Sequence, residues 1–190
     1  MKILTVNDLD LSLMKLIKNW EEVEVKLEYS TSFDDEDEMN VSLEGELIAV
    51  EYDFNAKDDE LELIEAKCGE FTVTIFDEDW HNLLEAADMH SQDACNIIEV
   101  CLTNEVDCFG RVAIIDHIEI HEDYQNLELG TKAMEQIMKF LEKIYKVNFI
   151  ILKVDESRNT EDKLIRFYKQ FHFKPIGGDQ TRLIFESEYF

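Results

Sequence analysis

Residues 121–134, HEDYQNLELGTKAM, hold the groups best suited to binding an anion. This polar stretch lies between an apolar run typical of a strand and a long amphipathic run typical of a helix. A helix that begins near Leu129 and Gly130 presents unpaired backbone N–H groups and a positive dipole end. Gly130 allows close approach to the backbone, and Lys132 adds a cation in the first turn. These residues predict an anion or diphosphate site, with a plain strand-to-helix turn as the alternative, because a single glycine at a helix start is common.

The elements that would position this loop alternate between strand and helix. The patterns predict strands over 111–120, 148–154 and 182–187 and helices over 129–146 and 159–173. The strand at 148–154 is almost wholly apolar, as expected for a buried strand with a parallel neighbour. Asn159 is the expected N-cap of the second helix, and Gly177–Gly178 are expected to turn the chain into its last strand.

The part before residue 110 reads differently, as a short helix followed by antiparallel strands. Helical spacing covers 11–20, and strand patterns cover 22–29, 41–54 and 60–76, with turns expected near 55–59 and at 68–69. Two short helices are expected over 80–89 and 91–102. The whole predicts an α+β (mixed α/β) domain, with a central mixed sheet flanked by helices and an acidic, β-rich N-terminal portion.

The formal charge of −26 is distributed unevenly along the chain. Up to Phe109 there are 30 acidic residues against 6 lysines, whereas from Gly110 onward there are 14 acidic and 12 basic residues. A surface this negative repels nucleic acid and anionic membranes and attracts cationic partners. We therefore expect no direct nucleic-acid or membrane partner. A merely solubilising face, a basic macromolecular substrate and mimicry of a nucleic-acid backbone all remain open.

The apolar runs and the cysteines indicate the compartment. No run of about 18 apolar residues is present, and the first ten residues are acidic without an apolar signal core. The cysteines Cys68, Cys95, Cys101 and Cys108 show no CxxC spacing. Reduced thiols and a cytoplasmic location are the expectation.

The second part resembles the GNAT N-acetyltransferase superfamily over about residues 95–186. The acyl-CoA motif of that superfamily is an apolar strand, then [Q/R]-x-x-G-x-[G/A], then a long helix. Residues 125–130, QNLELG, match it at Gln125 and Gly130, whereas Glu128 stands where the superfamily has its first glycine. The later motif, similar to LYEKLGFK, is matched by RFYKQFHFK, with His172 in place of the glycine.

The resemblance implies a binding site for acetyl-CoA as co-substrate. The pantetheine arm would insert between strands 111–120 and 148–154 and pair with backbone groups of Ile118, Glu119 and Ile120. The pyrophosphate would be held by N–H groups of Gln125, Asn126, Leu127, Glu128, Leu129, Gly130 and Thr131, and Asn159 is a further cofactor-binding candidate. A carboxylate at Glu128 opposes a diphosphate unless it points to solvent, and loss of glycine there could forbid the required backbone shape.

The resemblance also implies direct attack of a substrate amine on the thioester, with a general base and a general acid. Tyr168 matches the tyrosine that often protonates the departing thiolate, although a core aromatic would give the same pattern. For the base we choose Asp116, because it shares a strand face with Ile114, where some relatives carry a glutamate. Deprotonation through water is an equal alternative.

The segment HIEIH is a weak metal signal. His117, Glu119 and His121 would share one face of a strand, but a half-exposed strand beside a cleft gives this pattern readily. We expect no metal site.

The sequence therefore predicts one domain over 1–190, with an acidic β-rich portion over 1–90 and an acyl-CoA-binding portion over 91–190. The expected function is acetyl transfer from acetyl-CoA to an amine of a cationic acceptor, such as a basic protein, a polyamine or a small molecule. The alternative is a catalytically degenerate interaction protein whose acidic surface binds a basic, nucleic-acid-binding partner. Strand edges in the N-terminal portion also allow a homodimer.

Overall fold

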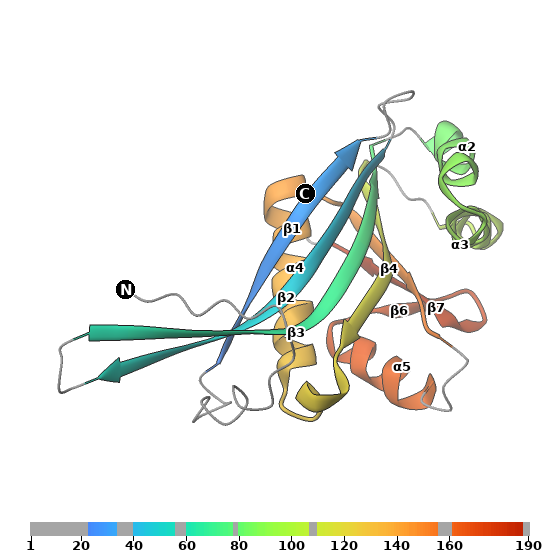
Figure 1. Ribbon diagram of the computed structural model, residues 1–190. Helices are drawn as coiled ribbons and strands as arrows, with labels where there is room; N and C mark the ends of the chain where they lie inside the picture. Colours follow the sequence, from blue (N-terminus) through green and yellow to red (C-terminus); the bar gives the residue numbers. More distant parts are fainter. Residues whose placement is uncertain are drawn as a thin grey trace. The chain divides into compact units, whose positions relative to one another are not determined.

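A computed structural model of the protein describes residues 23–33, 40–55, 60–77, 80–106, 110–155 and 161–187. Its elements follow one another in this order: β1 (Glu24–Phe33), β2 (Asn40–Asn55), β3 (Glu60–Phe76), α2 (Trp80–His90), α3 (Gln92–Thr103), β4 (Val112–Ile120), the 3₁₀ turn η1 (Glu122–Tyr124), α4 (Leu129–Phe140), the π-helical turn η2 (Leu141–Tyr145), β5 (Phe149–Lys153), α5 (Glu161–Gln170), β6 (Lys174–Ile176) and β7 (Asp179–Glu186) (Figure 1).

The strands form one seven-stranded sheet in the order β1-β2-β3-β4-β5-β7-β6. β4 and β5 are parallel, whereas β7 is antiparallel to both β5 and β6, so the sheet is mixed. Together with the helices α2 to α5 of the described residues, this confirms the predicted mixed α/β class.

The chain divides into two compact units. The first unit comprises Met1–Ser30, Glu44–Phe71 and Ile118–Ile137, and the second comprises Thr31–Leu43, Thr72–His117 and Met138–Phe190.

The core of the first unit is built from strand residues and one helical stripe. Ile64 and Ala66 of β3 are buried at the predicted strand alternation, whereas residues 47–50 of β2 are all buried, so both faces of β2 are covered there. The buried α4 residues of this unit are Leu129, Ala133, Met134 and Ile137, at the spacing of one helix face. The Cys68 thiol lies in this interior and donates to the Leu47 carbonyl at 3.2 Å.

The turn that the sequence predicts at Cys68–Gly69 is wrong, because β3 runs through these residues without interruption. Gly69 lies so close to the Glu119 carbonyl oxygen that any side chain would collide with it. The backbone of Cys68 also accepts a hydrogen bond from the His121 N–H at 2.9 Å. The glycine therefore permits close approach of two strands and does not mark a turn.

The core of the second unit is formed where α2 and α3 pack together on strand residues (Figure 1). Its buried members come from β3, α2, α3, β4, β5 and β6: Phe76, Leu83, Ala86, Ala87, Ala94, Ile97, Ile98, Cys101, Val112, Ile114, Phe149, Ile151 and Ile176. α3 begins as the sequence predicts, because the Ser91 hydroxyl oxygen accepts the Ala94 N–H at 3.1 Å.

The second unit also contains a polar clamp at the start of β4 and β5. The Asn148 side-chain oxygen accepts the Arg111 N–H at 2.9 Å. The Arg111 side chain donates to Asp77 and to the Tyr145 carbonyl, both at 2.8 Å. Gly110 has a φ of 73° and lies directly against the Asn148 side chain, so only glycine fits there without strain.

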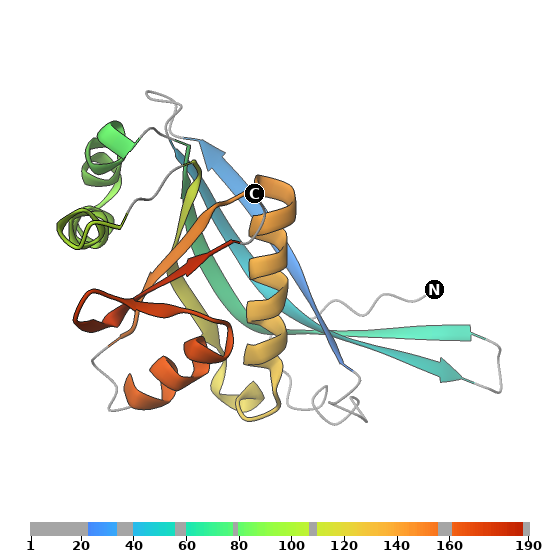
Figure 2. The ribbon, with the colours of Figure 1, turned by 180° about the vertical axis from the view of Figure 1, so that it is seen from behind.

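The elements from α4 to β7, coloured from yellow-orange to red in Figure 2, follow most of the predicted boundaries. α4 leads into the π turn η2 inside the segment predicted to be one helix, and Lys146, with a φ of 56°, ends it. β6 was not predicted, because a three-residue strand that contains Pro175 leaves no alternating pattern. Proline is tolerated there because β6 is an edge strand.

Some predictions lie outside the described residues. They include the helix over 11–20 and the N-cap role of Asn159. Among the helices that the structure describes, none has the length and apolar character needed to cross a membrane.

Candidate acyl-CoA and catalytic site

The loop that precedes α4 belongs to the first unit and is held by its own residues. Tyr124 is buried at the end of η1, and the Gln125 side chain donates to the Ile120 carbonyl at 3.0 Å. The Glu128 carbonyl accepts the N–H groups of Thr131 and Lys132 at 3.1 and 3.2 Å. The first two helical N–H groups, on Leu129 and Gly130, have no acceptor within the helix and point from its N-terminus. An anion placed there would meet N–H donors and the positive end of the helix dipole.

The backbone of this loop keeps the shape that glycine usually provides. Asn126 and Glu128 have φ values of 63° and 61°, in the left-handed region. Glu128 therefore adopts the conformation of the glycine that it replaces, at a cost of about 1–2 kcal/mol for a residue with a side chain. The Glu128 side chain is exposed. The missing glycine therefore does not prevent the loop from taking this backbone shape.

Lys132 has a different role from the one its position suggests. Its ammonium donates to the Val23 carbonyl at 2.7 Å, next to the start of β1. The cation thus ties α4 to the first residues of β1 inside the first unit. We assign the anion-binding capacity of the loop to backbone N–H groups alone.

β4 runs beyond its paired segment. In the second unit β4 pairs with β5 from Val112 opposite Phe149 to Ile115 opposite Leu152, and β5 ends at Lys153. β4 itself continues to Ile120, and its alternation is broken, because Asp116 and His117 are both exposed. Ile118, Glu119 and Ile120 are half-buried. Where the pairing of β4 with β5 ends, the edge of a parallel strand can offer backbone donors and acceptors to a ligand with amide groups.

These features fit acetyl-CoA. A diphosphate suits the N–H groups at the start of α4, and an amide-bearing pantetheine arm suits the backbone of β4 beyond Ile115. The side chains that the structure describes there add no cation to the loop. The exposed carboxylate of Glu128 opposes a diphosphate.

Asp116 is held in a short hydrogen-bonded chain inside the second unit. Thr74 of β3 donates its hydroxyl to Asp116 Oδ2 at 2.7 Å, and the same hydroxyl lies 3.0 Å from His90 Nε2 at the end of α2. Thr74 is fully buried. Although the residue as a whole is exposed, its carboxyl group faces the buried Thr74, and this partial desolvation raises the pKa of Asp116 above its ordinary value. The hydrogen bond from Thr74 and the nearby His90 act on the pKa in the opposite direction. A raised pKa makes a carboxylate a stronger base, as general-base catalysis requires.

Tyr168 lies in α5, also in the second unit. The residue is buried beside the rings of Phe167 and Phe173. Burial raises the pKa of its hydroxyl to about 12. The hydroxyl therefore stays protonated at neutral pH and is able to donate a hydrogen bond to a departing thiolate.

The helix that carries Tyr168 ends on a second substituted glycine position. His172 has a φ of 65°, its N–H donates to the Lys169 carbonyl, and the Phe173 N–H donates to the Tyr168 carbonyl. This pair of bonds is the Schellman motif, which normally places glycine in the left-handed residue. His172 thus keeps the backbone geometry of the glycine it replaces, as Glu128 does.

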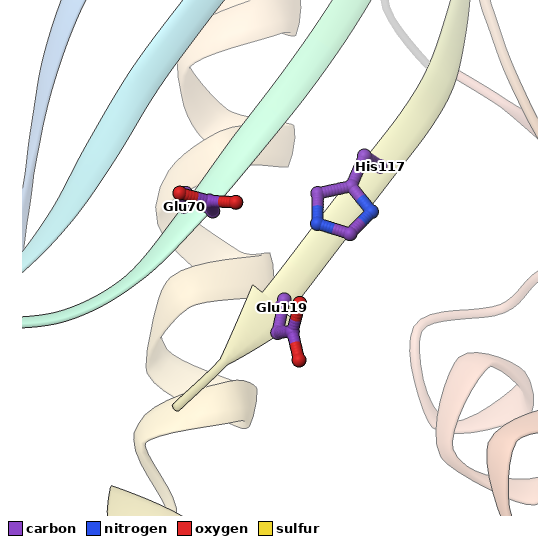
Figure 3. Close-up of side chains that lie close together, drawn as sticks. All are labelled: Glu70, His117 and Glu119. Atoms are coloured by element: carbon purple, nitrogen blue, oxygen red, sulfur yellow. The ribbon is translucent and has the colours of Figure 1, made fainter. Parts of the chain in front are cut away.

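Two carboxylates and one imidazole lie together near the end of β4. One carboxylate oxygen each of Glu70 and Glu119 and one ring nitrogen of His117 all lie within 4.8 Å of one another (Figure 3). Glu70 and His117 are exposed and Glu119 is half-buried, and exposed acidic pairs are common without an ion. We assign no metal to this group.

The sequence did not reveal Thr74 and His90 as companions of Asp116. The three residues come from separate elements, and no local motif links them. The sequence signal was weak: Thr74 is a polar residue within the largely apolar run FTVTIF. The structure buries it fully. Asn159, which the resemblance offered as a cofactor contact, lies outside the described residues.

Comparison with known proteins gives the family. Residues 51–173 match the Acetyltransferase (GNAT) family. Among solved structures the chain is similar to AtaT complexed with acetyl-methionyl-tRNAfMet, at 12% identity over 76% of this chain and 71% of that chain, with a TM-score of 0.42. It is also similar to NAA60 of Arabidopsis thaliana in complex with a bisubstrate analogue, at 17% identity over 78% of this chain and 77% of that chain, with a TM-score of 0.42. No curated protein matches the chain in sequence. Because the family match spans well over half of the chain, the protein belongs to the GNAT acetyltransferase family, whose fold supports acetyl transfer in general.

Proposed function

We propose that the protein is an N-acetyltransferase that transfers an acetyl group from acetyl-CoA to an amine of a cationic substrate by direct attack. The observation that carries this proposal is the loop before α4. Its left-handed residues Asn126 and Glu128 lead into the start of α4, where the first backbone N–H groups have no acceptor within the helix. The family match supports the same assignment, because the GNAT fold supports acetyl transfer in general.

Binding would use backbone groups of two segments. The N–H groups of residues 125–131 would hold the pyrophosphate, and the backbone of Ile118, Glu119 and Ile120 would pair with the pantetheine amides. Asn159 is a further candidate contact. When bound, acetyl-CoA supplies a thioester whose carbonyl carbon is open to attack by an amine.

Proton transfer would involve two side chains of the second unit. Asp116, with a raised pKa, would take the proton that the amine loses as the new C–N bond forms. Tyr168 would donate a hydrogen bond to the sulfur as the C–S bond breaks. Because a pKa of about 12 lies above that of an ordinary thiol, we expect Tyr168 to stabilise the thiolate mainly by this hydrogen bond.

The acceptor is proposed to be cationic because the chain carries a formal charge of −26. Release of free CoA thiol, measured with acetyl-CoA and spermidine, a lysine-rich peptide or an aminoglycoside, tests the proposal. We expect thiol release with at least one of these cationic amines and none with a neutral amide of similar size.

Two variants connect that activity with the assigned residues. Asp116→Asn should lower kcat by about 100-fold or more, and Tyr168→Phe should lower it by about 10-fold or more. Neither change should alter the affinity for acetyl-CoA much. Acetyl-CoA binding without any thiol release would contradict the catalytic assignment. Salt-sensitive capture of a basic protein that persists in Tyr168→Phe and Gly130→Glu, without catalysis, would support the alternative of an interaction protein.

A further inference from the structure

The hydroxyl of Thr74 is enclosed between two ionisable side chains. Thr74 is fully buried, and its oxygen lies 2.7 Å from Asp116 Oδ2 and 3.0 Å from His90 Nε2. All three residues belong to the second unit, and they come from β3, β4 and the last turn of α2.

The hydroxyl has only one hydrogen, and this fixes the direction of both bonds. An ionised carboxylate can only accept, so the Thr74 hydrogen goes to Asp116. The Thr74 oxygen must then accept from His90, whose Nε2 must carry a hydrogen. The neutral imidazole with its hydrogen on Nδ1 would instead place two lone pairs against each other at 3.0 Å.

We propose that Thr74 and His90 are positioning residues for Asp116, and that the chain Nε2–H···Oγ1–H···Oδ2 holds this carboxylate ionised and in one orientation. Each bond in such a chain polarises the next, so the His90 donor strengthens the bond that Thr74 makes to the carboxylate. The proposal rests on the role of Asp116 as the base in the proposed function, and it adds the two residues that keep that base ready.

The need for such a chain follows from the surroundings of Asp116. Partial burial favours the neutral acid, which could accept no proton from an amine. A hydrogen bond to the charged form opposes this effect. Asp93 of α3 is the other charged group that acts on Asp116, and its like charge also favours the neutral acid. Lys153 of β5 lies 4.0 Å from Asp93 and partly offsets that charge.

His90 is oriented by an aromatic neighbour. The ring of Phe76 meets the His90 ring edge-on, with a centroid distance of 5.9 Å and an interplanar angle of 81°. This contact supports one ring orientation, with Nε2 facing Thr74. A histidine held in this way can serve as a directed donor to Thr74.

NMR titration of the free protein tests the chain without an acceptor. The carboxyl ¹³C signal of Asp116 gives its titration midpoint, and the ring ¹⁵N signals of His90 give its tautomer. In Thr74→Val, which keeps the buried shape, the midpoint should move upward by about one pH unit, the worth of a hydrogen bond to a charge. Thr74→Ser keeps the hydroxyl and should restore the wild-type midpoint.

The His90 variants separate the donor from the ring. His90→Phe should move the Asp116 midpoint upward by less than Thr74→Val does, whereas His90→Gln, which retains an N–H donor, should shift it least. The neutral wild-type ring should carry its hydrogen on Nε2. A ring with its hydrogen on Nδ1, or an unchanged midpoint in a folded Thr74→Val, would overturn the proposal.

Activity measurements distinguish the positioning role of Thr74 and His90 from the proposed role of Asp116 as the base. If Asp116→Asn retains full thiol release with acetyl-CoA and spermidine, Asp116 is not the base, and the proposed function fails at that residue. If Asp116→Asn is inactive, the acid limb of the kcat/KM profile should move to higher pH in Thr74→Val and return in Thr74→Ser. An inactive Asp116→Asn combined with a wild-type profile in Thr74→Val would overturn the positioning role alone.

Discussion

At the scale of single residues, two residues with side chains adopt the left-handed backbone conformation that glycine normally adopts. Glu128 precedes α4 and His172 follows α5, and their φ values of 61° and 65° lie in the left-handed region. The sequence identified both positions as departures from the family motif. It could not say whether the backbone would change, because strain of about 1–2 kcal/mol is small enough for tertiary packing to impose.

Glu128→Gly should stabilise the fold and strengthen acetyl-CoA binding. Removing the left-handed strain is worth about 1 kcal/mol, or roughly 2–4 °C in Tm. Removing a carboxylate beside a diphosphate should tighten acetyl-CoA binding several-fold, on the order of 1 kcal/mol. Differential scanning fluorimetry and calorimetry measure the two effects.

Two matched variants separate strain from charge. Asn126→Gly relieves a φ of 63° without changing charge, and the gain should be smaller because asparagine tolerates this region. Glu128→Gln removes the charge and keeps the strain, so it should tighten binding without raising Tm. An unchanged acetyl-CoA affinity in both Glu128 variants would mean that this side chain does not face the diphosphate.

The residues around Asp116 show where sequence reasoning stops. Asp116 was chosen as the base from the family pattern and strand alternation, and that role stays a prediction. Thr74 and His90 were not, because a hydrogen-bonded chain across three elements depends on the register of β3 with β4 and on how α2 ends.

At the scale of elements, periodicity predicted most strands and helices, and local chemistry caused the errors. β4, β5, α4 and α5 have strong patterns, and their existence and type are confirmed. At Gly69 the sequence predicted a turn, because glycine is common in turns. The glycine is in fact needed for the close approach of the Glu119 carbonyl, which no local sequence pattern indicates. β6 escaped prediction because it is short and gains its identity only by pairing with β7.

Gly110→Ala should lower the free energy of unfolding strongly, because it disturbs the start of β4. Gly110 has a φ of 73°, and an added Cβ would collide with the Asn148 side chain that binds the Arg111 N–H. We expect a loss of about 2 kcal/mol or more in the free energy of unfolding, measured with urea.

Gly178→Ala is the matched control for that change. No atom lies within 4 Å of a Cβ added at Gly178. Its free energy of unfolding should stay within about 0.5 kcal/mol of wild type. Equal effects of the two substitutions would contradict the clamp at Asn148.

The turn between β6 and β7 should give an acid-sensitive contribution to stability. Burial alone would raise the pKa of Asp179, but hydrogen bonds from Thr181 and the ion pair with Arg182 outweigh it and lower the pKa from 3.8 to about 2. A lowered pKa means that the stabilisation is present above pH 3.8 and is lost as the pH falls towards 2. Asp179→Asn should therefore be less stable than wild type at pH 6, and the difference should vanish near pH 2. A difference that persists at pH 2 would point to a cause other than this ionisation.

At the scale of the whole molecule, the charge distribution is the property most directly linked to the acceptor. The formal charge is −26, and most of the excess lies before residue 110. A field of this sign raises the encounter rate of cations, and salt screens it over a Debye length of about 10 Å at 0.1 M. The sequence predicted this property completely, because the formal charge depends on composition alone and not on the fold.

Raising the ionic strength should therefore slow the encounter with a cationic acceptor and leave the rate of the chemical step unchanged. For a cationic amine such as spermidine, kcat/KM should fall by about tenfold between 20 and 300 mM salt, while kcat changes little. Steady-state rates at several salt concentrations measure this, and a singly charged amine serves as the control with a weaker dependence. Salt-independent kcat/KM for both amines would contradict electrostatic attraction of the acceptor.

The central claim is that the loop over residues 125–131 binds acetyl-CoA. Titration calorimetry of acetyl-CoA into the full chain tests it most directly, with Gly130→Glu as the variant that places a carboxylate at the helix start. We predict saturable binding to one site per chain, with Kd at about 1 mM or below, and at least about tenfold weaker binding in Gly130→Glu. Absence of both heat and thermal shift at about millimolar acetyl-CoA, or equal binding by wild type and Gly130→Glu, would contradict it.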